Sequence, residues 1–157
     1  MSIEKVRAYF KSVNMEARIM EFDVSSATVE LAAQAVGVEG KRIAKTLSFM
    51  TGEGCILVVA AGDAKIDNSK FKARFQCKAK MLAYDEVPVY VGHAVGGVCP
   101  FAVKEDVKIY LDVSLRRFET VFPACGSSNS AIKLTLDELE QFSGASGWVD
   151  VCKAWCD

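Results

Sequence analysis

Two apolar segments separated by three residues constrain the fold more than any other feature of the sequence. Residues 43–51 (IAKTLSFMT) and 55–61 (CILVVAA) have the length and composition of β-strands, and Gly52-Glu53-Gly54 between them supplies a short turn. The pattern predicts a hairpin. Because residues 55–61 are apolar without alternation, we expect both faces of that second strand to be covered.

Helices and strands follow one another along the rest of the chain without the regular rhythm of βαβ units. We expect a helix over residues 3–13 and a second that begins at a cap within 25–28 and ends at Val36. A third should begin at a cap provided by Asp67 or Asn68, and a fourth at the T-x-x-E capping box of Thr135–Glu138. A last helix is expected at the C-terminus, where Cys152 and Cys156 would share one face. Strands are expected over 17–22, 108–113, 119–125 and 130–134, while 85–91 fits either a helix start or a strand. This order predicts an α+β fold, a single domain over residues 1–157 with a mixed or largely antiparallel sheet flanked by helices.

Composition excludes several classes of protein. With 51% hydrophobic and 25% charged residues among 157, the chain has the composition of an ordinary globular protein, and it has no apolar run long enough to span a membrane. The first ten residues lack the apolar core of a signal peptide, so we expect a cytoplasmic protein with reduced cysteines. The single histidine and the lack of a CxxC motif argue against a zinc site, and we expect no metal.

One lysine stands on an apolar face of the first hairpin strand. Because alternate residues of a strand share a face, Lys45 lines up with Ile43, Leu47 and Phe49. Two interpretations are open. The ammonium group reaches solvent at the start of the strand, or an anionic group meets it there.

A loop rich in glycine, GHAVGGVCP over residues 92–100, is a second candidate site. Glycine permits positive φ and close approach of the main chain to a ligand, so such a loop can direct N–H groups at a carbonyl or phosphate oxygen. The structural alternative is a tight turn at a sheet edge. A third interpretation is a thiol hydrolase, with Cys99 as nucleophile and His93 six residues away as its base.

The segment 65–80 is locally basic in a chain whose net charge is −1. Six lysines and arginines stand there against Asp67 alone. The segment either contacts phosphates locally or is the solvated face of an amphipathic helix.

Four segments together resemble one protein family. IAKTLSF, GDAKID, VGGVCPF and ACGSSNSAIKLTLDEL stand in the order and spacing of the YbaK/prolyl-tRNA-synthetase-associated domain family, which includes free-standing editing deacylases related to the insertion domain of bacterial prolyl-tRNA synthetase. The resemblance covers roughly residues 5 to 155. Its most specific part is the combination of Lys45-Thr46-Leu47 with the GxxxP loop from Gly96 to Pro100.

The resemblance implies hydrolysis of a wrong amino acid from the 3′ end of a transfer RNA, without a metal or an organic cofactor. Lys45 resembles the lysine that holds the phosphate and ribose of the substrate. Gly96, Gly97 and Pro100 match the loop whose main chain meets the aminoacyl group. Ser127, Ser128 and Asn129 fall where related proteins line the pocket with small or polar residues.

These implications give a specific hypothesis. We expect a monomeric aminoacyl-tRNA deacylase that removes a small amino acid from tRNA-Pro or a similar tRNA, with a synthetase as a possible transient partner. Phe22, Thr28 and Thr46 are further candidates to line its pocket, and Lys45 and the 96–100 turn should share one cleft. The alternative is a module of the same fold that binds an aminoacyl-tRNA or a nucleotide without catalysis.

Overall fold

The computed structural model describes residues 2–156 as a mixed sheet flanked by helices. The helices are α1 (Ser2–Ser12), α2 (Val29–Val36), α3 (Asn68–Phe75), α4 (Val87–Tyr90) and α5 (Leu136–Ser143), with 3₁₀ turns at Glu16–Arg18, Gly40–Arg42 and Val113–Arg117. The strands are β1 (Ile19–Glu21), β2 (Ile43–Thr51), β3 (Gly54–Ala61), β4 (Lys65–Ile66), β5 (Lys108–Asp112), β6 (Thr120–Pro123), β7 (Ser130–Ile132), β8 (Leu134–Thr135), β9 (Gly147–Val149) and β10 (Cys152–Lys153).

The main sheet has six strands in the order β8-β6-β2-β3-β5-β9. The predicted hairpin is confirmed, since β2 and β3 pair antiparallel with Lys45 opposite Ala60. The β6–β2, β3–β5 and β5–β9 pairs are parallel, and the β8–β6 pair is antiparallel. The expected α+β fold with a mixed sheet is therefore confirmed, and parallel pairs make up three of the five pairings.

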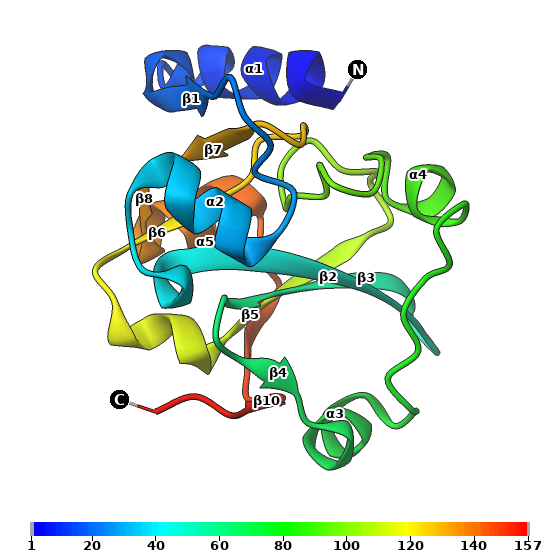
Figure 1. The fold of residues 1–157 in the computed structure, drawn as a ribbon. Helices are drawn as coiled ribbons and strands as arrows, with labels where there is room; N and C mark the ends of the chain where they lie inside the picture. The colour runs from blue at the N-terminus through cyan, green and yellow to red at the C-terminus, as the bar shows by residue number, and fades with distance from the viewer. Residues whose placement is uncertain (1, 157) are drawn as a thin grey trace.

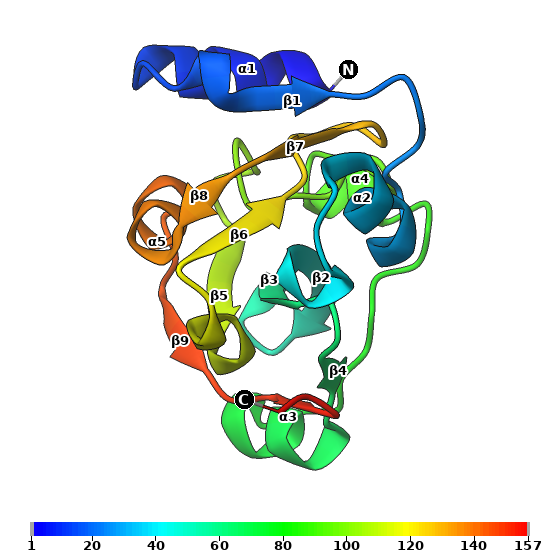
Figure 2. The ribbon, with the colours of Figure 1, turned by 60° about the vertical axis from the view of Figure 1, so that its left-hand side comes forward.

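Strand β3 runs through the core, as its apolar sequence predicts. Every residue from Cys55 to Ala61 is buried, with at most 7% of its surface exposed. On one face α3 packs against the sheet, because the Phe71 ring lies 4.8 Å from the ring of Phe49 between centroids. Figures 1 and 2 show α3 at one end of the molecule and α2, α4 and the α1–β1–β7 layer on the other side of β2.

Local capping signals predicted several helix ends correctly. Thr28 caps α2 by accepting a hydrogen bond from the Leu31 N–H, and Gly37 ends that helix in the left-handed conformation. Asp67, rather than Asn68, caps α3. The capping box is present at Thr135, which begins α5.

The expected C-terminal helix is wrong. Residues 147–149 instead form β9, which pairs parallel with β5, and Cys152–Lys153 form β10, which pairs antiparallel with β4. Pairing with strands distant in sequence overrides the local helical spacing of Cys152 and Cys156. The ambiguous segment 85–91 contains a single helical turn, α4.

No helix within residues 2–156 combines the length and the hydropathy that crossing a membrane requires.

Candidate functional site

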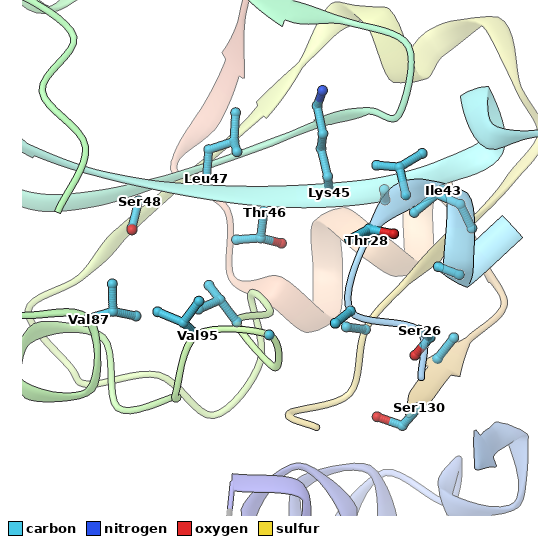
Figure 3. Close-up of a pocket in the computed structure, with 18 of the residues that line it drawn as sticks. Ser26, Thr28, Ile43, Lys45, Thr46, Leu47, Ser48, Val87, Val95 and Ser130 are labelled. Carbon is cyan, nitrogen blue, oxygen red and sulfur yellow. The ribbon is translucent and has the colours of Figure 1, made fainter. Parts of the chain in front are cut away.

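A cavity of about 450 Å³ lies beside β2, on the side of the sheet opposite α3. Its walls come from β2 and from four segments distant in sequence, within residues 26–32, 81–87, 95–98 and 122–131 (Figure 3). A cavity of this volume is in the usual range for small-molecule sites. Because the segments meet only through tertiary folding, the cavity is a property of the whole sheet and its flanking loops.

The cavity borders a stretch of β2 that has no strand partner on that side. Strand β6 pairs only with Ile43 and Ala44, and residues 80–82 flank β2 further along, where the Leu82 N–H donates to the Ser48 carbonyl at 3.2 Å. The Met50 N–H likewise donates to the Lys80 carbonyl at 3.1 Å.

In this stretch of β2, the main-chain N–H and C=O groups of successive residues point alternately toward β3 and away from it. Since Ser48 and Met50 direct their main-chain groups away from β3, Thr46 does the same. The N–H and C=O of Thr46 therefore face the open edge between the two flanking segments. They offer a bound molecule one donor and one acceptor.

Buried side-chain hydroxyls add to this polar lining. Within residues 2–156, three buried side-chain polar atoms have no hydrogen-bond partner: Thr46 Oγ1, Ser26 Oγ and His93 Nδ1. Both of the hydroxyl groups belong to residues of the cavity wall. Buried polar groups are normally paired, and these two hydroxyls have no partner within residues 2–156.

The first turn of α2 also borders the cavity. The Thr28 hydroxyl is used inside the protein, because it accepts a hydrogen bond from the Leu31 N–H at 3.2 Å. Val29, the first residue of the helix, is part of the cavity wall. The positive end of the helix dipole therefore faces this region and favours a carbonyl or anionic oxygen there.

The predicted glycine loop reaches the cavity through Gly96. This residue has φ of +96°, a conformation that glycine adopts without strain, and it is part of the cavity wall. Gly97 is buried instead, and a Cβ atom there would lie 2.7–2.9 Å from main-chain atoms of Gly126 and Ser127. The Gly97 N–H donates to the Ala94 carbonyl at 3.0 Å, so it is occupied within its own turn.

The segment after Gly126 holds the chain that leads to the cavity wall at residues 26–28. The Phe22 N–H donates to the Asn129 carbonyl at 2.8 Å, and Asn129 Nδ2 donates to the Phe22 carbonyl at 3.0 Å. The Ser26 N–H donates to the Ser128 carbonyl at 2.6 Å. The buried Ser127 hydroxyl lies 2.9 Å from Asn129 Oδ1. These contacts fix the segment that carries Ser26 and Thr28.

Lys45 belongs to the cavity wall, but its ammonium group does not point into the cavity. Figure 3 shows its side chain on the face of β2 opposite Thr46. The ammonium donates to the Ala64 carbonyl and lies 3.4 Å from the Gly62 carbonyl. Burial lowers the pKa of this lysine, and the neighbouring Asp63 carboxylate acts in the opposite direction.

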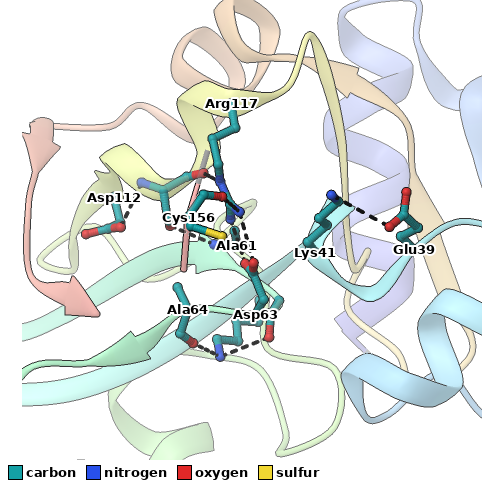
Figure 4. A network of polar contacts seen from close by, with 11 residues as sticks. Glu39, Lys41, Ala61, Asp63, Ala64, Asp112, Arg117 and Cys156 are labelled. Atoms are coloured by element: carbon teal, nitrogen blue, oxygen red, sulfur yellow. Dashed lines mark hydrogen bonds and ion pairs between the residues drawn. The ribbon is translucent and has the colours of Figure 1, made fainter. Parts of the chain in front are cut away.

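The loop that holds this ammonium is itself fixed by an ion pair. Arg117 donates to both oxygens of Asp63, at 2.6 and 2.9 Å, and to the Cys156 carbonyl at 2.9 Å (Figure 4). The guanidinium holds the pKa of Asp63 below its ordinary value. Lys45 and Arg117 thus engage the same loop, on the α3 side of the sheet.

The Cys99–His93 pair is close but unsuited to nucleophilic catalysis. The Cys99 sulfur lies 3.5 Å from His93 Nε2, and that nitrogen lies 2.7 Å from the Phe101 carbonyl. Both side chains are fully buried outside the cavity wall. Burial raises the pKa of Cys99 to about 12 and lowers the pKa of His93. The thiol therefore stays protonated near neutral pH, which argues against a thiol hydrolase.

Helix α3 carries three of the six cations of the basic segment, and part of this charge has partners inside the protein. Lys70 pairs with Asp150 at 3.1 Å. The Arg74 guanidinium lies over the rings of Phe75 and Tyr110. These contacts favour the interpretation of α3 as an amphipathic helix with a solvated face.

The structure divides the predicted site residues into two groups. Lys45, Thr46, Thr28 and Gly96 belong to the cavity wall. The others lie outside the wall: Phe22, Gly97, Pro100, Ser127, Ser128 and Asn129. Which of them act on a substrate stays a prediction. Sequence reasoning did not single out Ser26, Ser48, Tyr84, Val95 and Ser130 of the wall. Ser48, Val95 and Ser130 stand in the quoted segments, but nothing in the sequence shows that these side chains reach a cavity.

Comparisons with known proteins point to translation. Residues 23–142 match the family described as the aminoacyl-tRNA editing domain. An uncharacterized protein of Bacillus subtilis, YwhH, is 56% identical over 99% of both chains. A proline–tRNA ligase of Limosilactobacillus fermentum is 29% identical over 73% of this chain but only 22% of its own. An Enterococcus faecalis protein provisionally named as a Cys-tRNA(Pro)/Cys-tRNA(Cys) deacylase is 27% identical over 68% of this chain and 66% of its own.

A solved structure shares the fold over nearly the whole chain. It is described provisionally as a trans-editing enzyme for prolyl-tRNA synthetase. It is 27% identical to this chain, with a TM-score of 0.86 over 97% of each chain.

Proposed function

The chain belongs to the family of aminoacyl-tRNA editing domains, and on that basis we propose that it is a deacylase that hydrolyses the aminoacyl ester of mischarged tRNA. The observation that carries this proposal is the cavity beside the open edge of β2. It combines the main-chain groups of Thr46 that face the open edge with the buried hydroxyls of Thr46 and Ser26. Such a lining suits the amino, carbonyl and ribose groups of an aminoacyl adenosine end.

Hydrolysis of an aminoacyl ester needs only modest catalysis, because the ester is already activated. One donor placed at the developing oxyanion is worth about 10²–10³ in rate. The Thr46 N–H at the open edge and the positive end of α2 are the groups available for this task. Of the described residues in the cavity wall, only Lys45 carries a charge, and its ammonium is directed elsewhere. A hydroxyl of the ribose or a group of the amino acid then assists the attacking water.

Lys45 has a proposed role outside the cavity. A tRNA end that crosses the edge of β2 would place its ester against Thr46 and its terminal phosphate toward the α3 side. The ammonium, now held by the carbonyls of Gly62 and Ala64, would exchange one of these contacts for a phosphate oxygen.

The substrate is proposed to be a small amino acid on tRNA-Pro or a similar tRNA. A difference of one methylene group is worth only about 1–3 kcal/mol, so exclusion of larger amino acids must come from the cavity walls. The related deacylase and proline–tRNA ligases support the choice of tRNA. We propose a monomer that works in the cytoplasm and meets a synthetase only transiently.

One observation favours a second candidate, a module that binds aminoacyl-tRNA without hydrolysing it. No carboxylate or imidazole belongs to the cavity wall among residues 2–156, so no side chain there is an evident general base.

Release of labelled amino acid from a panel of misacylated tRNAs separates the two candidates. The amino acid and the tRNA should be varied independently, with wild type and Lys45→Ala compared on each substrate. We expect wild type to hydrolyse at least one small aminoacyl ester and Lys45→Ala to be slower. If the wild type binds these tRNAs and leaves every ester intact, the chain is a binding module.

A further inference from the structure

Three exposed apolar side chains belong to the wall of the cavity. Within residues 2–156, the large hydrophobic side chains that are exposed come from 24–31, from 81–90 and from Val95. Of these, Met81, Tyr84 and Val95 belong to the cavity wall. Single exposed apolar residues are common on any protein, whereas a group around one opening indicates contact with a partner.

Tyr84 is the most exposed member of this group, with 78% of its surface exposed. It does not stand on a loose loop. The preceding residues are held along β2 by the Leu82 N–H, which donates to Ser48 at 3.2 Å. The following turn is closed because the Ala83 N–H donates to a Glu86 carboxylate oxygen at 2.8 Å. The main chain that carries the exposed phenol ring is therefore held in place beside the cavity.

Two lysines precede Tyr84 on the same segment. Lys78 and Lys80 are exposed, and neither makes an ion pair with any residue of the part of the chain that the structure describes. Tyr84 follows these cations by four and six residues, and proteins bind single-stranded nucleic acid with such a combination, in which an aromatic ring stacks on a base and cations neutralise the phosphates. A protein partner would need no such charges.

We propose that Tyr84 stacks against the terminal adenine of the tRNA while the aminoacyl group occupies the cavity, with Met81 beside the ring and Lys78 and Lys80 near the preceding phosphates. This inference rests on the proposed function, since it assigns the base of the same substrate. Stacking tolerates any base, so Tyr84 would contribute affinity for the common 3′ end, while the cavity selects the amino acid.

The test is a binding measurement that does not depend on catalysis. The probe is alanine in amide linkage to 3′-amino-3′-deoxyadenosine, which the protein cannot release by ester hydrolysis. A second probe carries the same alanine amide on the sugar without adenine. Calorimetry should compare wild type, Tyr84→Ala and Tyr84→Phe. Tyr90→Ala is the matched control, because Tyr90 is also exposed but lies outside the cavity wall.

We expect Tyr84→Ala to weaken binding of the adenine-containing probe by about 5- to 150-fold, the range measured for loss of one stacked base. Tyr84→Phe, which keeps the ring, and Tyr90→Ala should change it less than about twofold. Binding of the probe without adenine should be the same in all four proteins.

Two results would overturn the inference. In one, Tyr84→Ala binds the adenine-containing probe as well as wild type does. In the other, it weakens both probes equally, so that the ring acts on the cavity rather than on the base. If, in the first case, Tyr84→Ala also loses binding to prolyl-tRNA synthetase, the surface belongs to a protein partner. A wild type that binds the probe but hydrolyses no ester refutes only the deacylase proposal.

Discussion

Replacing Thr46 by valine removes its hydroxyl group and leaves the shape of the side chain and the pairing of β2 nearly unchanged. Valine has nearly the same shape, and the hydroxyl that it removes is buried without a partner in the protein. A buried unpaired polar group costs about 1–3 kcal/mol, part of which the substitution recovers. We therefore expect the free energy of unfolding of Thr46→Val to equal or exceed that of wild type, by up to about 1 kcal/mol.

Activity should change in the opposite direction. If the hydroxyl binds the aminoacyl end, its loss removes one hydrogen bond in the complex, worth about 0.5–1.5 kcal/mol, and lowers kcat/KM by about 2- to 12-fold. Thr46→Ser keeps the hydroxyl and should retain most of the activity. Thr28→Val is a contrasting control, since it removes the cap of α2 and should lower stability by about 0.5–2 kcal/mol.

Denaturant titration and single-turnover deacylation of one misacylated tRNA would measure both effects. Destabilisation of Thr46→Val by more than about 1 kcal/mol would mean that the hydroxyl has a partner in the protein. An unchanged kcat/KM in a stable variant would mean that it does not meet the substrate. Either result refutes the reasoning from the unpaired hydroxyl.

Three further predictions concern residues outside the cavity wall. Cys99→Ser should hydrolyse the ester at the wild-type rate, because a pKa of about 12 leaves only about one thiol in 10⁵ ionised at pH 7; a large loss without a change in melting temperature would restore the thiol mechanism. The pKa of Asp63 is lowered in the folded protein, so the stability that its carboxylate contributes is complete above its ordinary pKa of about 4 and is lost as the pH falls through the lower folded pKa. The difference in unfolding free energy between wild type and Asp63→Asn should therefore become smaller in acid. A difference that stays constant with pH would count against the ion pair. Gly97→Ala places a methyl group against the main chain of 126–127 and should cost about 1–3 kcal/mol by denaturant titration, whereas Gly52→Ala, with no atom within 4 Å, should cost far less, and equal costs would contradict the close packing.

The sequence predicted the features that depend on neighbours along the chain. Alternation in β2 correctly placed Lys45 and Phe49 on one face, and the apolar run of β3 correctly predicted its burial. Caps identified the starts of α2 and α5, because capping bonds join residues only three apart.

Features that depend on distant pairing were beyond sequence reasoning. The open edge at Thr46 exists because β6, some 75 residues later, pairs with only the first two residues of β2. The ammonium of Lys45 faces the carbonyls of Gly62 and Ala64 because a loop after β3 folds back over it. The C-terminal residues became strands for the same reason, since β5 and β4 offered them partners.

The candidate site was predicted in part. Lys45, Thr46 and Gly96 do share one cavity, as their motifs suggested, but the ammonium and the cavity lie on different faces of β2. Tyr84 and Ser26 carried no motif, and only their position at the mouth or in the wall of the cavity singles them out.

The central claim is that the cavity at the open edge of β2 receives the aminoacyl end of a tRNA. Titration of the ¹⁵N-labelled protein with alanine amide-linked to 3′-amino-3′-deoxyadenosine tests it most directly. The account predicts that the amide resonances of Thr46, Ser26 and Gly96 shift together, while those of β4 and β10 do not. Shifts confined to the α3 side, with Thr46 and Gly96 unchanged at saturating probe, would contradict it.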